Sequence, residues 1–316
     1  MKSLPKISII TPSLNQGRFL EQTIRSVLDQ QYSNLEYIII DGGSTDETLA
    51  VLRRYEKHLI WVSEPDNGQT DAINKGFLRA HGDIVAWLCA DDLYEKDTIR
   101  RVVEYFQHHT ATGMVYGECL YIDAQGKVIG KYPTTNFDIE SLLSFCFIPQ
   151  PTVFLRRSVL DRVGILDPAL QFAMDLDLWI RVALKEQIDF LPKVLARYRL
   201  HNGSKTVSWS TAVEKEGIRV RERYLKDPAL NKRIGRAHRK VSNTVFLRAA
   251  SFYFYEGDLT KTVEYLMKAF RANPVSREIW RLPLYAWRSM CRRRERRLRN
   301  HSAEERIVHL VGARPQ

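Results

Sequence analysis

The chain has 316 residues, 44% of them hydrophobic, and a formal net charge of +11. This length is typical of about two domains, and no apolar run approaches the roughly 20 residues of a membrane-spanning helix. The four cysteines lack zinc-site and redox-motif spacing, which favours reduced thiols in a cytoplasmic protein. The N-terminus leads directly into an apolar run, so no signal peptide is expected.

The positive charge is concentrated in the C-terminal third. Residues 1–214 carry 23 basic and 27 acidic side chains, a net charge of −4, whereas residues 215–316 carry 25 and 10, a net charge of +15. This asymmetry predicts an anionic partner for the C-terminal part, either nucleic acid or a membrane surface.

Apolar runs and helical periodicities alternate through the first 90 residues. Strands are expected at 7–10, 35–40, 59–63 and 84–88, and helices at 19–30, after Ser44 or Thr45, and at 71–79. This alternation predicts an α/β fold with a mostly parallel sheet covered on both faces. Polar or glycine-rich loops follow the strands, and they should meet at one sheet edge, where such folds bind ligands.

The apolar run that starts at Ile84 ends in two adjacent carboxylates, Asp91 and Asp92. Two acids at a strand end repel each other, and a hard divalent ion bound to substrate phosphates would hold them together. The alternative is that one of them caps a helix starting near Tyr94. The loops lack the glycine-rich dinucleotide signature and the Walker lysine motif, which disfavours nicotinamide and P-loop chemistry.

The middle of the chain predicts a hairpin of strands at 116–122 and 128–131, a strand at 148–154 and a helix ending near Val163. A further helix begins near Asp175, because apolar residues from Leu176 onward fall on one helical face. Asp175 would interact favourably with the helix dipole as a cap, and Asp177 would be a solvated acid of the first turn.

Four groups of residues occur in a distinctive order. They are 9–15, 38–46, 66–69 with 72–76, and 82–84 leading to 90–92. As an ordered set they resemble the family 2 inverting glycosyltransferases of the GT-A (nucleotide-diphospho-sugar transferase-like) fold, over roughly the first 205 residues. The resemblance implies a GT-A sheet flanked by helices, a nucleotide-sugar donor and a divalent metal, Mn²⁺ or Mg²⁺.

The resemblance also implies a nucleotide pocket. It would contain Thr11, Ser13 and Asp41, with Asp41 near the base, as well as Asp91 at the ribose or a shared metal position and Asp92 as metal ligand. Many members have Asp where this chain has Cys89, so the metal motif is a variant. The simpler interpretation of Cys89 is a small buried hydrophobe.

Residues 172–181 resemble the acidic base motif of the family, with Met174 in place of the usual Glu. Inverting transfer needs a carboxylate that takes the acceptor hydroxyl's proton, and a metal that neutralises the leaving diphosphate. The resemblance makes Asp175 the base candidate and Asp177 the second choice. A purely structural capping role stays open for Asp175.

Residues 197–205 resemble the Tyr-Arg-x-His-x-x-Ser segment of the family. In that segment His201 would approach the metal or diphosphate, since His is a common metal ligand. Arg199 and Lys205 would assist as nucleotide-binding cations, because Arg and Lys suit phosphate oxygens.

The expected domains are a GT-A domain at 1–211 and a helical, basic extension at 212–316. A helical hairpin at 241–255 and 259–272 resembles a single tetratricopeptide-like unit. Aromatic residues at 280–287 and seven arginines at 288–299 suit a segment lying on anionic lipid. The alternatives are a solvated basic tail and nucleic-acid binding, for which no recognition motif is present.

We therefore predict a metal-dependent inverting glycosyltransferase that uses a nucleotide-sugar donor, a UDP-sugar in the first place. Its acceptor would be a glycan or a lipid-linked sugar, reached from the cytoplasm at the inner face of the plasma membrane. One alternative is a nucleotidyltransferase, which would need a basic, glycine-rich signature after the first strand. The other is a catalytically inactive nucleotide-sugar-binding scaffold.

Overall fold

The computed structural model describes residues 4–276 of the chain. The strands are β1 (Ile7–Ser13), β2 (Leu35–Asp41), β3 (Ile60–Ser63), β4 (Ile84–Trp87), β5 (Leu93–Tyr94), β6 (Thr112–Ile122), β7 (Val128–Lys131), β8 (Phe154–Arg156) and β9 (Gln187–Arg199). Within these residues they form one mixed sheet in the order β3-β2-β1-β4-β8-β6-β9-β5, with β7 paired to β6. The N-terminal strands β3, β2, β1 and β4 are mutually parallel.

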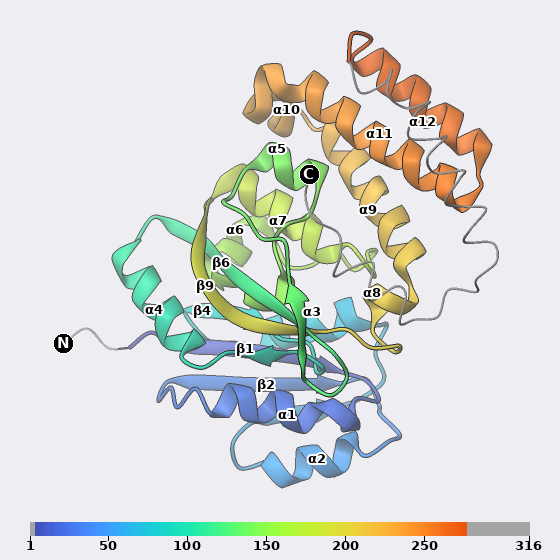
Figure 1. Ribbon diagram of the computed structural model, residues 1–316. Helices are drawn as coiled ribbons and strands as arrows, with labels where there is room; N and C mark the ends of the chain where they lie inside the picture. The colour runs from blue at the N-terminus through green and yellow to red at the C-terminus, as the bar shows by residue number, and fades with distance from the viewer. Residues whose placement is uncertain (1–3, 277–316) are drawn as a thin grey trace.

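Helices cover both faces of the sheet, as predicted (Figure 1). They are α1 (Gly17–Leu28), α2 (Thr48–Tyr55), α3 (Gln69–Arg79), α4 (Thr98–His108), α5 (Ile139–Ser144), α6 (Arg157–Val163), α7 (Met174–Lys185), α8 (Lys205–Ser208), α9 (Ser210–Leu225), α10 (Pro228–Ile234), α11 (His238–Glu256) and α12 (Leu259–Ala272), with 3₁₀ turns at Gln150–Thr152 and Gly235–Ala237. The α/β class is confirmed.

Successive side chains of the parallel strands enter two different cores. Ile9 and Ile39 pack with α1, α2 and α4, whereas Ile10 and Ile38 pack with α3, α5, α6 and α7. This alternation follows from the two-residue period of a strand. It explains why the central strands are apolar at nearly every position.

The register brings the strand ends together at one edge. Ser13 pairs with Asp41 across β1 and β2, and Ile10 pairs with Trp87 across β1 and β4. The loops after β1, β2 and β4 therefore leave the sheet side by side. The strand ends that the sequence predicted to meet therefore do lie at one edge of the sheet.

One alternative and one local prediction are wrong. The alternative of a helix starting near Tyr94 is replaced by β5, because Leu93 and Tyr94 pair with residues of β9 far along the chain, and α4 begins only at Thr98. The strand expected at 148–154 contains a 3₁₀ turn at Gln150–Thr152, and β8 starts at Phe154. Proline at Pro151 lacks the N–H that a strand ladder needs.

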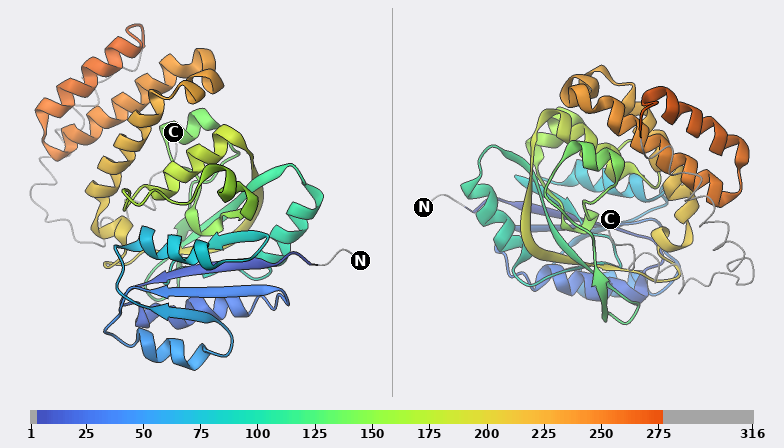
Figure 2. Two further views of the ribbon diagram at one scale, coloured as in Figure 1. Left: turned by 180° about the vertical axis from the view of Figure 1, so that it is seen from behind. Right: turned by 45° about the horizontal axis from the view of Figure 1, so that its top comes forward.

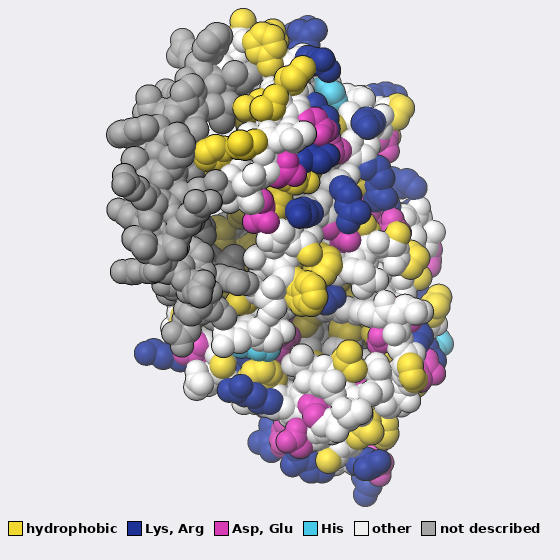
Figure 3. All heavy atoms as spheres, turned by 90° about the vertical axis from the view of Figure 1, so that its right-hand side faces the viewer, with side chains coloured by type: hydrophobic (Ala, Val, Ile, Leu, Met, Phe, Trp, Pro, Cys, Tyr) yellow, Lys and Arg dark blue, Asp and Glu magenta, His cyan; other side chains and the backbone are white. Residues whose placement is uncertain are grey.

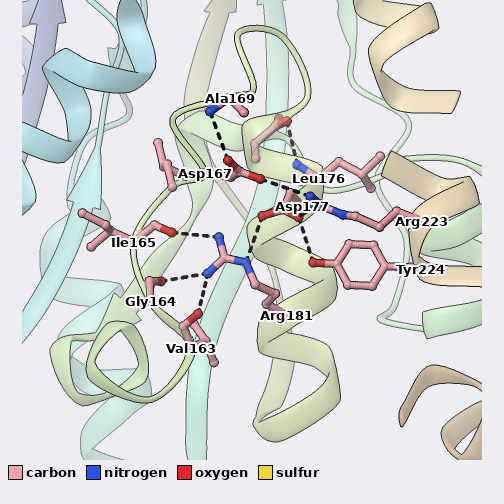
Figure 4. A network of polar contacts seen from close by, with 12 residues as sticks. Val163, Gly164, Ile165, Asp167, Ala169, Leu176, Asp177, Arg181, Arg223 and Tyr224 are labelled. Atoms are coloured by element: carbon pink, nitrogen blue, oxygen red, sulfur yellow. Dashed lines mark hydrogen bonds and ion pairs between the residues drawn. The ribbon is translucent and has the colours of Figure 1, made fainter. Parts of the chain in front are cut away.

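Helix α9 is fastened to α7 through a buried carboxylate (Figure 4). Asp177 on α7 is 1% exposed and accepts hydrogen bonds from Arg181 Nε at 2.9 Å and from the Tyr224 hydroxyl at 2.8 Å. Arg223 of α9 forms an ion pair with the same carboxylate. Arg181 also donates to three backbone carbonyls, those of residues 163–165.

The hydrophobic core continues into the C-terminal helices. Val220 and Tyr224 of α9, Leu230 of α10 and Val241 of α11 belong to the same buried cluster as Trp179 of α7. Figure 2 shows these helices packed beside α5 and α7 in both views. A boundary at residue 211 therefore does not separate two hydrophobic cores.

The predicted hairpin of α11 and α12 is confirmed, and it turns at Gly257, whose φ of 88° suits glycine. Helix α12 carries a row of exposed apolar side chains, and apolar side chains appear in the upper part of the face in Figure 3. The row contains Leu259, Val263, Met267 and Phe270.

The aromatic and arginine-rich segment predicted at 280–299 lies outside the described residues. Among the helices described, none combines the length and apolarity needed to cross a bilayer.

The Asp177 contacts predict a stability effect. Asp177→Ala should lower the free energy of unfolding by about 3 kcal/mol, the lower end for a broken buried ion pair, since its arginine partners remain partly exposed. Urea unfolding followed by circular dichroism would measure the loss. Asp161→Ala, at an exposed position of α6, is the matched control. Equal losses in the two variants would contradict the structural role of Asp177.

Candidate functional site

A cleft of about 820 Å³ opens at the edge where the parallel strands end. Its walls combine the loops after β1 and β4, the start of α7, the segment around α8, and helices α9 and α11. The lining includes Ser13, Asp66, Gln69, Cys89, Asp91, Gln150, Met174, Asp175, Lys205, Glu214, Gly217, Arg221 and Arg248. The C-terminal helices therefore contribute directly to the site.

Asp91 and His201 form a close pair at this cleft. His201 Nε2 lies 3.0 Å from Asp91 Oδ2, and the two side chains are 11% and 15% exposed. The Gly203 N–H donates to His201 Nδ1 at 3.1 Å, and the Phe19 ring lies 4.7 Å from the imidazole. Because Nδ1 accepts, a neutral ring carries its proton on Nε2 and donates it to Asp91. Nε2 and the carboxylate are thus oriented toward one another.

Asp92 lies behind this pair. Its side chain is fully buried, and Oδ1 accepts a hydrogen bond from the Arg199 N–H at 2.9 Å. Oδ2 has no partner among the described residues. Burial, together with the Asp91 carboxylate, holds the pKa of Asp92 well above its usual range. The sequence prediction put Asp92 at the metal and Asp91 at the ribose or a shared metal position; of the two, Asp91 lines the cleft.

Cys89 lines the cleft as a hydrogen-bonded thiol. Its Sγ accepts from Gln69 Nε2 at 3.2 Å and donates to Gln150 Oε1 at 3.5 Å. Burial and the two neighbouring aspartates raise the pKa of the thiol well above its usual value, so the group stays neutral. Gln69 belongs to the motif at 66–69, but the sequence assigned no role to it or to Gln150.

These residues fit a divalent cation. Ligand atoms of Cys89, Asp91 and Asp92 all lie within 4.8 Å of one another. Without a cation, burial and the neighbouring carboxylate favour a proton on Asp92, whose Oδ2 has no partner in the part of the chain that the structure describes, and a divalent cation would take the place of that proton. Carboxylate and imidazole suit Mn²⁺, and carboxylate suits Mg²⁺, whereas a protonated thiol does not suit either.

Arg199 has a different position from the one expected. It is fully buried and donates through Nε to the Asp91 carbonyl at 2.7 Å and through Nη2 to Gln22 Oε1 at 2.9 Å. Its guanidinium also lies 4.8 Å from the Phe19 ring centroid. These contacts hold the loop that carries Asp91, and Arg199 is not part of the cleft wall.

Lys205 does line the cleft. Its Nζ donates to the Gln171 carbonyl at 3.0 Å and lies 5.3 Å from the Phe172 ring centroid. Burial lowers the pKa of this amine. Of the two predicted diphosphate-binding cations, Lys205 is therefore the one placed beside the cleft.

The predicted nucleotide-pocket residues after β1 and β2 differ in exposure. Asp41 is fully buried and accepts from Ser63 Oγ at 2.7 Å and from the Ser44 N–H at 2.9 Å, which shapes its own turn. The Thr11 hydroxyl is 3.1 Å from the Tyr37 hydroxyl inside the sheet. Only Ser13 lines the cleft, and its Oγ has no partner within the described part of the chain.

Asp175 and Asp177 point to different environments. Asp175 lines the cleft, and burial raises its pKa to about 6, although the Leu176 N–H donates to it at 2.7 Å. Asp177 is enclosed in the contacts with α9 described above. Asp175 can therefore meet a substrate, and Asp177 is occupied by structural partners.

Glu216 of α9 caps the start of α7 and was not found from the sequence. Its carboxylate accepts from the backbone N–H groups of Gln171, Phe172 and Ala173 at 3.0, 2.6 and 2.7 Å. An acid at a helix N-terminus satisfies otherwise unpaired donors and interacts favourably with the dipole. The helix that carries Asp175 thus depends on a residue 41 positions later in the chain.

Known proteins resemble this chain in sequence. The model of the family described as glycosyl transferase family 2 matches residues 8–164. An uncharacterized glycosyltransferase of Nostoc sp. is 30% identical over 242 residues, covering 70% of this chain and 75% of that protein. TuaG of Bacillus subtilis, named as a putative teichuronic acid biosynthesis glycosyltransferase, is 30% identical to this chain. The match covers 69% of this chain and 88% of TuaG.

The similarities define a sugar-transferring enzyme. The chain belongs to glycosyltransferase family 2. Among solved structures, S. aureus TarS residues 1–349 with UDP gives a TM-score of 0.58 at 15% identity, covering 86% of this chain and 93% of that one. Mannosyltransferase PcManGT of Pyrobaculum calidifontis, in complex with GDP-Man and Mn²⁺, gives a TM-score of 0.58 at 19% identity. That match covers 87% of this chain and 89% of the mannosyltransferase. The predicted GT-A fold is confirmed.

The geometry makes a prediction for the metal. Asp91→Asn should weaken Mn²⁺ binding in the presence of UDP by at least about tenfold, because even residues that only support metal ligands contribute this much. Asp92→Asn should weaken it less, since Asn keeps the acceptor for the Arg199 N–H. Isothermal titration calorimetry measures both.

Asp29→Asn, at an exposed position after α1, is the control for the loss of one carboxylate. The assignment of Asp91 fails if Asp92→Asn abolishes Mn²⁺ binding while Asp91→Asn leaves it unchanged. Melting temperatures of all three variants separate loss of binding from loss of folding.

Proposed function

We propose that this glycosyltransferase moves a sugar from a nucleotide-sugar donor, a UDP-sugar in the first place, to a hydroxyl of a glycan or lipid-linked acceptor, with inversion. The observation that carries the proposal is Asp175, a cleft carboxylate with a pKa raised to about 6. It shares the cleft wall with Asp91, at a site that fits a divalent metal.

In the proposed reaction Asp175 takes the proton of the acceptor hydroxyl as its oxygen attacks the anomeric carbon. A new carbon–oxygen bond forms on one face of the sugar, and the bond to the diphosphate breaks on the other. A pKa near 6 keeps Asp175 ionised at neutral pH yet basic enough to accept the proton, as general-base catalysis requires.

The leaving nucleoside diphosphate needs compensation of its negative charge, which a bound divalent metal supplies. Asp91 and His201 are the residues proposed to hold this metal, with the Asp92 carboxylate behind them. His201 Nε2 would bind it with the imidazole proton moved to Nδ1, in place of the contact with the Gly203 N–H. Lys205 is proposed to face the diphosphate, because ammonium groups bind phosphate oxygens. Ser13 supplies an unpartnered hydroxyl to the nucleotide end of the cleft.

Other residues support the site from behind in this proposal. Asp41 shapes the turn that ends β2, and Arg199 holds the backbone of Asp91. Glu216 and Asp177 fix helix α7, so that Asp175 keeps its position. In this proposal these four residues affect the rate through the positions of others, without touching the substrate.

The relatives support a place in cell-envelope glycan synthesis. TuaG is named for teichuronic acid biosynthesis, and a relative in Mycobacterium tuberculosis, 30% identical, for PGL/p-HBAD biosynthesis. The solved neighbours were crystallised with UDP, UDP-GlcNAc or GDP-Man with Mn²⁺. These names favour a UDP- or GDP-sugar and a cell-envelope acceptor at the cytoplasmic side of the membrane.

The proposal is tested by release of nucleoside diphosphate from a panel of UDP-, GDP- and dTDP-sugars with Mn²⁺ or Mg²⁺. We expect one donor to be cleaved, and Asp175→Asn to lower the rate at least about 100-fold, the usual contribution of a general base. Asp161→Asn, on the exposed face of α6, should leave the rate unchanged. Binding of UDP with Mn²⁺, but no turnover of any donor or acceptor, would instead indicate a nucleotide-sugar-binding scaffold.

The raised pKa of Asp175 predicts the pH dependence. The base must be deprotonated to work, so kcat should rise as the pH increases through about 6 and level off above it. The residual activity of Asp175→Asn should lack this limb. A wild-type profile flat between pH 5 and 7, measured at saturating donor, would contradict Asp175 as the base.

A further inference from the structure

One cleft residue has a charge without an ionic partner. Arg221 of α9 is 8% exposed and lines the cleft. Its Nε donates to the Leu143 carbonyl at 2.8 Å, and no carboxylate forms an ion pair with it among residues 4–276. A guanidinium has five N–H donors, of which this contact uses one. A buried cation with so few partners is costly unless an anion joins it.

A second guanidinium approaches the same place. Arg248 of α11 also lines the cleft, donates through Nη1 to the Ser144 carbonyl at 2.6 Å and lies 5.3 Å from the Phe145 ring centroid. Both arginines therefore meet the C-terminal carbonyls of α5, the end of a helix that attracts cations. Glu214, 3.9 Å from Arg248, offsets part of the charge of Arg248, and its charge also acts on Arg221.

The backbone of α9 leaves room for the Arg221 head. Gly217 lies one turn before Arg221, and a Cβ added there would be 2.8 Å from Arg221 Nη1. Glycine inside a helix is less favourable than alanine. The space at Gly217, itself part of the cleft wall, lets the guanidinium fold along the helix and open onto the cleft.

The part of the cleft wall that contains Arg221 and Arg248, its basic end, comes from different elements than the loops after β1 and β4, its nucleotide end. The loops after β1 and β4 lie within the family match at residues 8–164, whereas Arg221 and Arg248 come from helices beyond it. Burial raises the pKa of Asp175, and the positive charge of Arg221 acts in the opposite direction and lowers it. Arg221 is therefore close to the proposed base but comes from the opposite part of the chain from the donor loops.

We propose that Arg221 and Arg248 form an acceptor subsite that binds an oxyanion, a phosphate ester or a carboxylate, carried by the acceptor beside the hydroxyl that reacts. The subsite rests on the proposed function, since it names the acceptor class for the same cleft. Guanidinium groups bind both oxyanions through paired hydrogen bonds. The acceptor is thus an acidic glycan or a sugar phosphate ester rather than a neutral sugar.

The test uses the full chain and three probes that share one alkyl group: n-hexyl phosphate, n-hexyl glucuronide and neutral n-hexyl glucoside. Calorimetric titrations are run with UDP and Mn²⁺ saturating the donor site, and again without nucleotide. We expect at least one anionic probe to bind at least tenfold more tightly than the glucoside. The anion that binds identifies phosphate or carboxylate as the group recognised.

Three variants separate the subsite from general charge effects. Arg221→Gln should weaken the anionic probe at least tenfold, and Arg221→Lys, which keeps the charge but not the planar fork, should weaken it less. Arg233→Gln removes the same charge from an exposed position of α10 and should change nothing. Preference for the glucoside, or equal anion binding by wild type and Arg221→Gln, would overturn the subsite.

Failure of the proposed function would give a different result. In that case no donor would be cleaved, whether or not UDP with Mn²⁺ binds, while the titrations without nucleotide would still decide whether Arg221 binds an anion. If donor cleavage depends on Asp175 but anion binding does not depend on Arg221, the transferase proposal stands and the subsite is wrong.

Discussion

The site depends on the capping of helix α7 by the Glu216 carboxylate. The backbone N–H groups of Gln171, Phe172 and Ala173, the three residues immediately before α7, converge on this one side chain of α9. An anion is a strong hydrogen-bond partner for such groups, and its charge also interacts favourably with the N-terminal end of the helix dipole. The Asp177 contacts with Arg223 and Tyr224 fasten the same two helices one turn further along. Asp175, placed between these two attachments, owes its position in the cleft to the C-terminal helices.

The charged groups around Asp91 are held mainly by hydrogen bonds between side chains and the backbone. Arg199 binds the Asp91 carbonyl through its side chain and Asp92 Oδ1 through its own N–H. The Asp91 carboxylate is left to face His201, and Asp92 Oδ2 is left without a partner in the described residues. The site is short of positive charge at its carboxylates. A divalent cation would complement such a site.

The cleft joins two chemistries that arise from different parts of the chain. The loops after β1 and β4 provide Ser13 and Asp91 and lie within the part that matches the family, and Lys205 follows β9 outside that part. The C-terminal helices provide Arg221 and Arg248. In the proposals above, the first group binds the donor, and helices outside the family match select the acceptor.

The sequence alone predicted strands β1 to β4, the edge at which their loops meet, and the resemblance that named Asp91, His201, Lys205 and Asp175. These features follow from local apolar patterns and from motifs of adjacent residues. Only the tertiary structure decided that β5 and β9 join the sheet, that Asp177 and Arg199 are held outside the cleft wall, that Asp92 lies buried behind Asp91, and that Glu216 and Arg221 belong to the site. The physical reason is that hydrogen bonds between residues 41 or more positions apart decide which way a charged side chain turns, and no local periodicity encodes such partners.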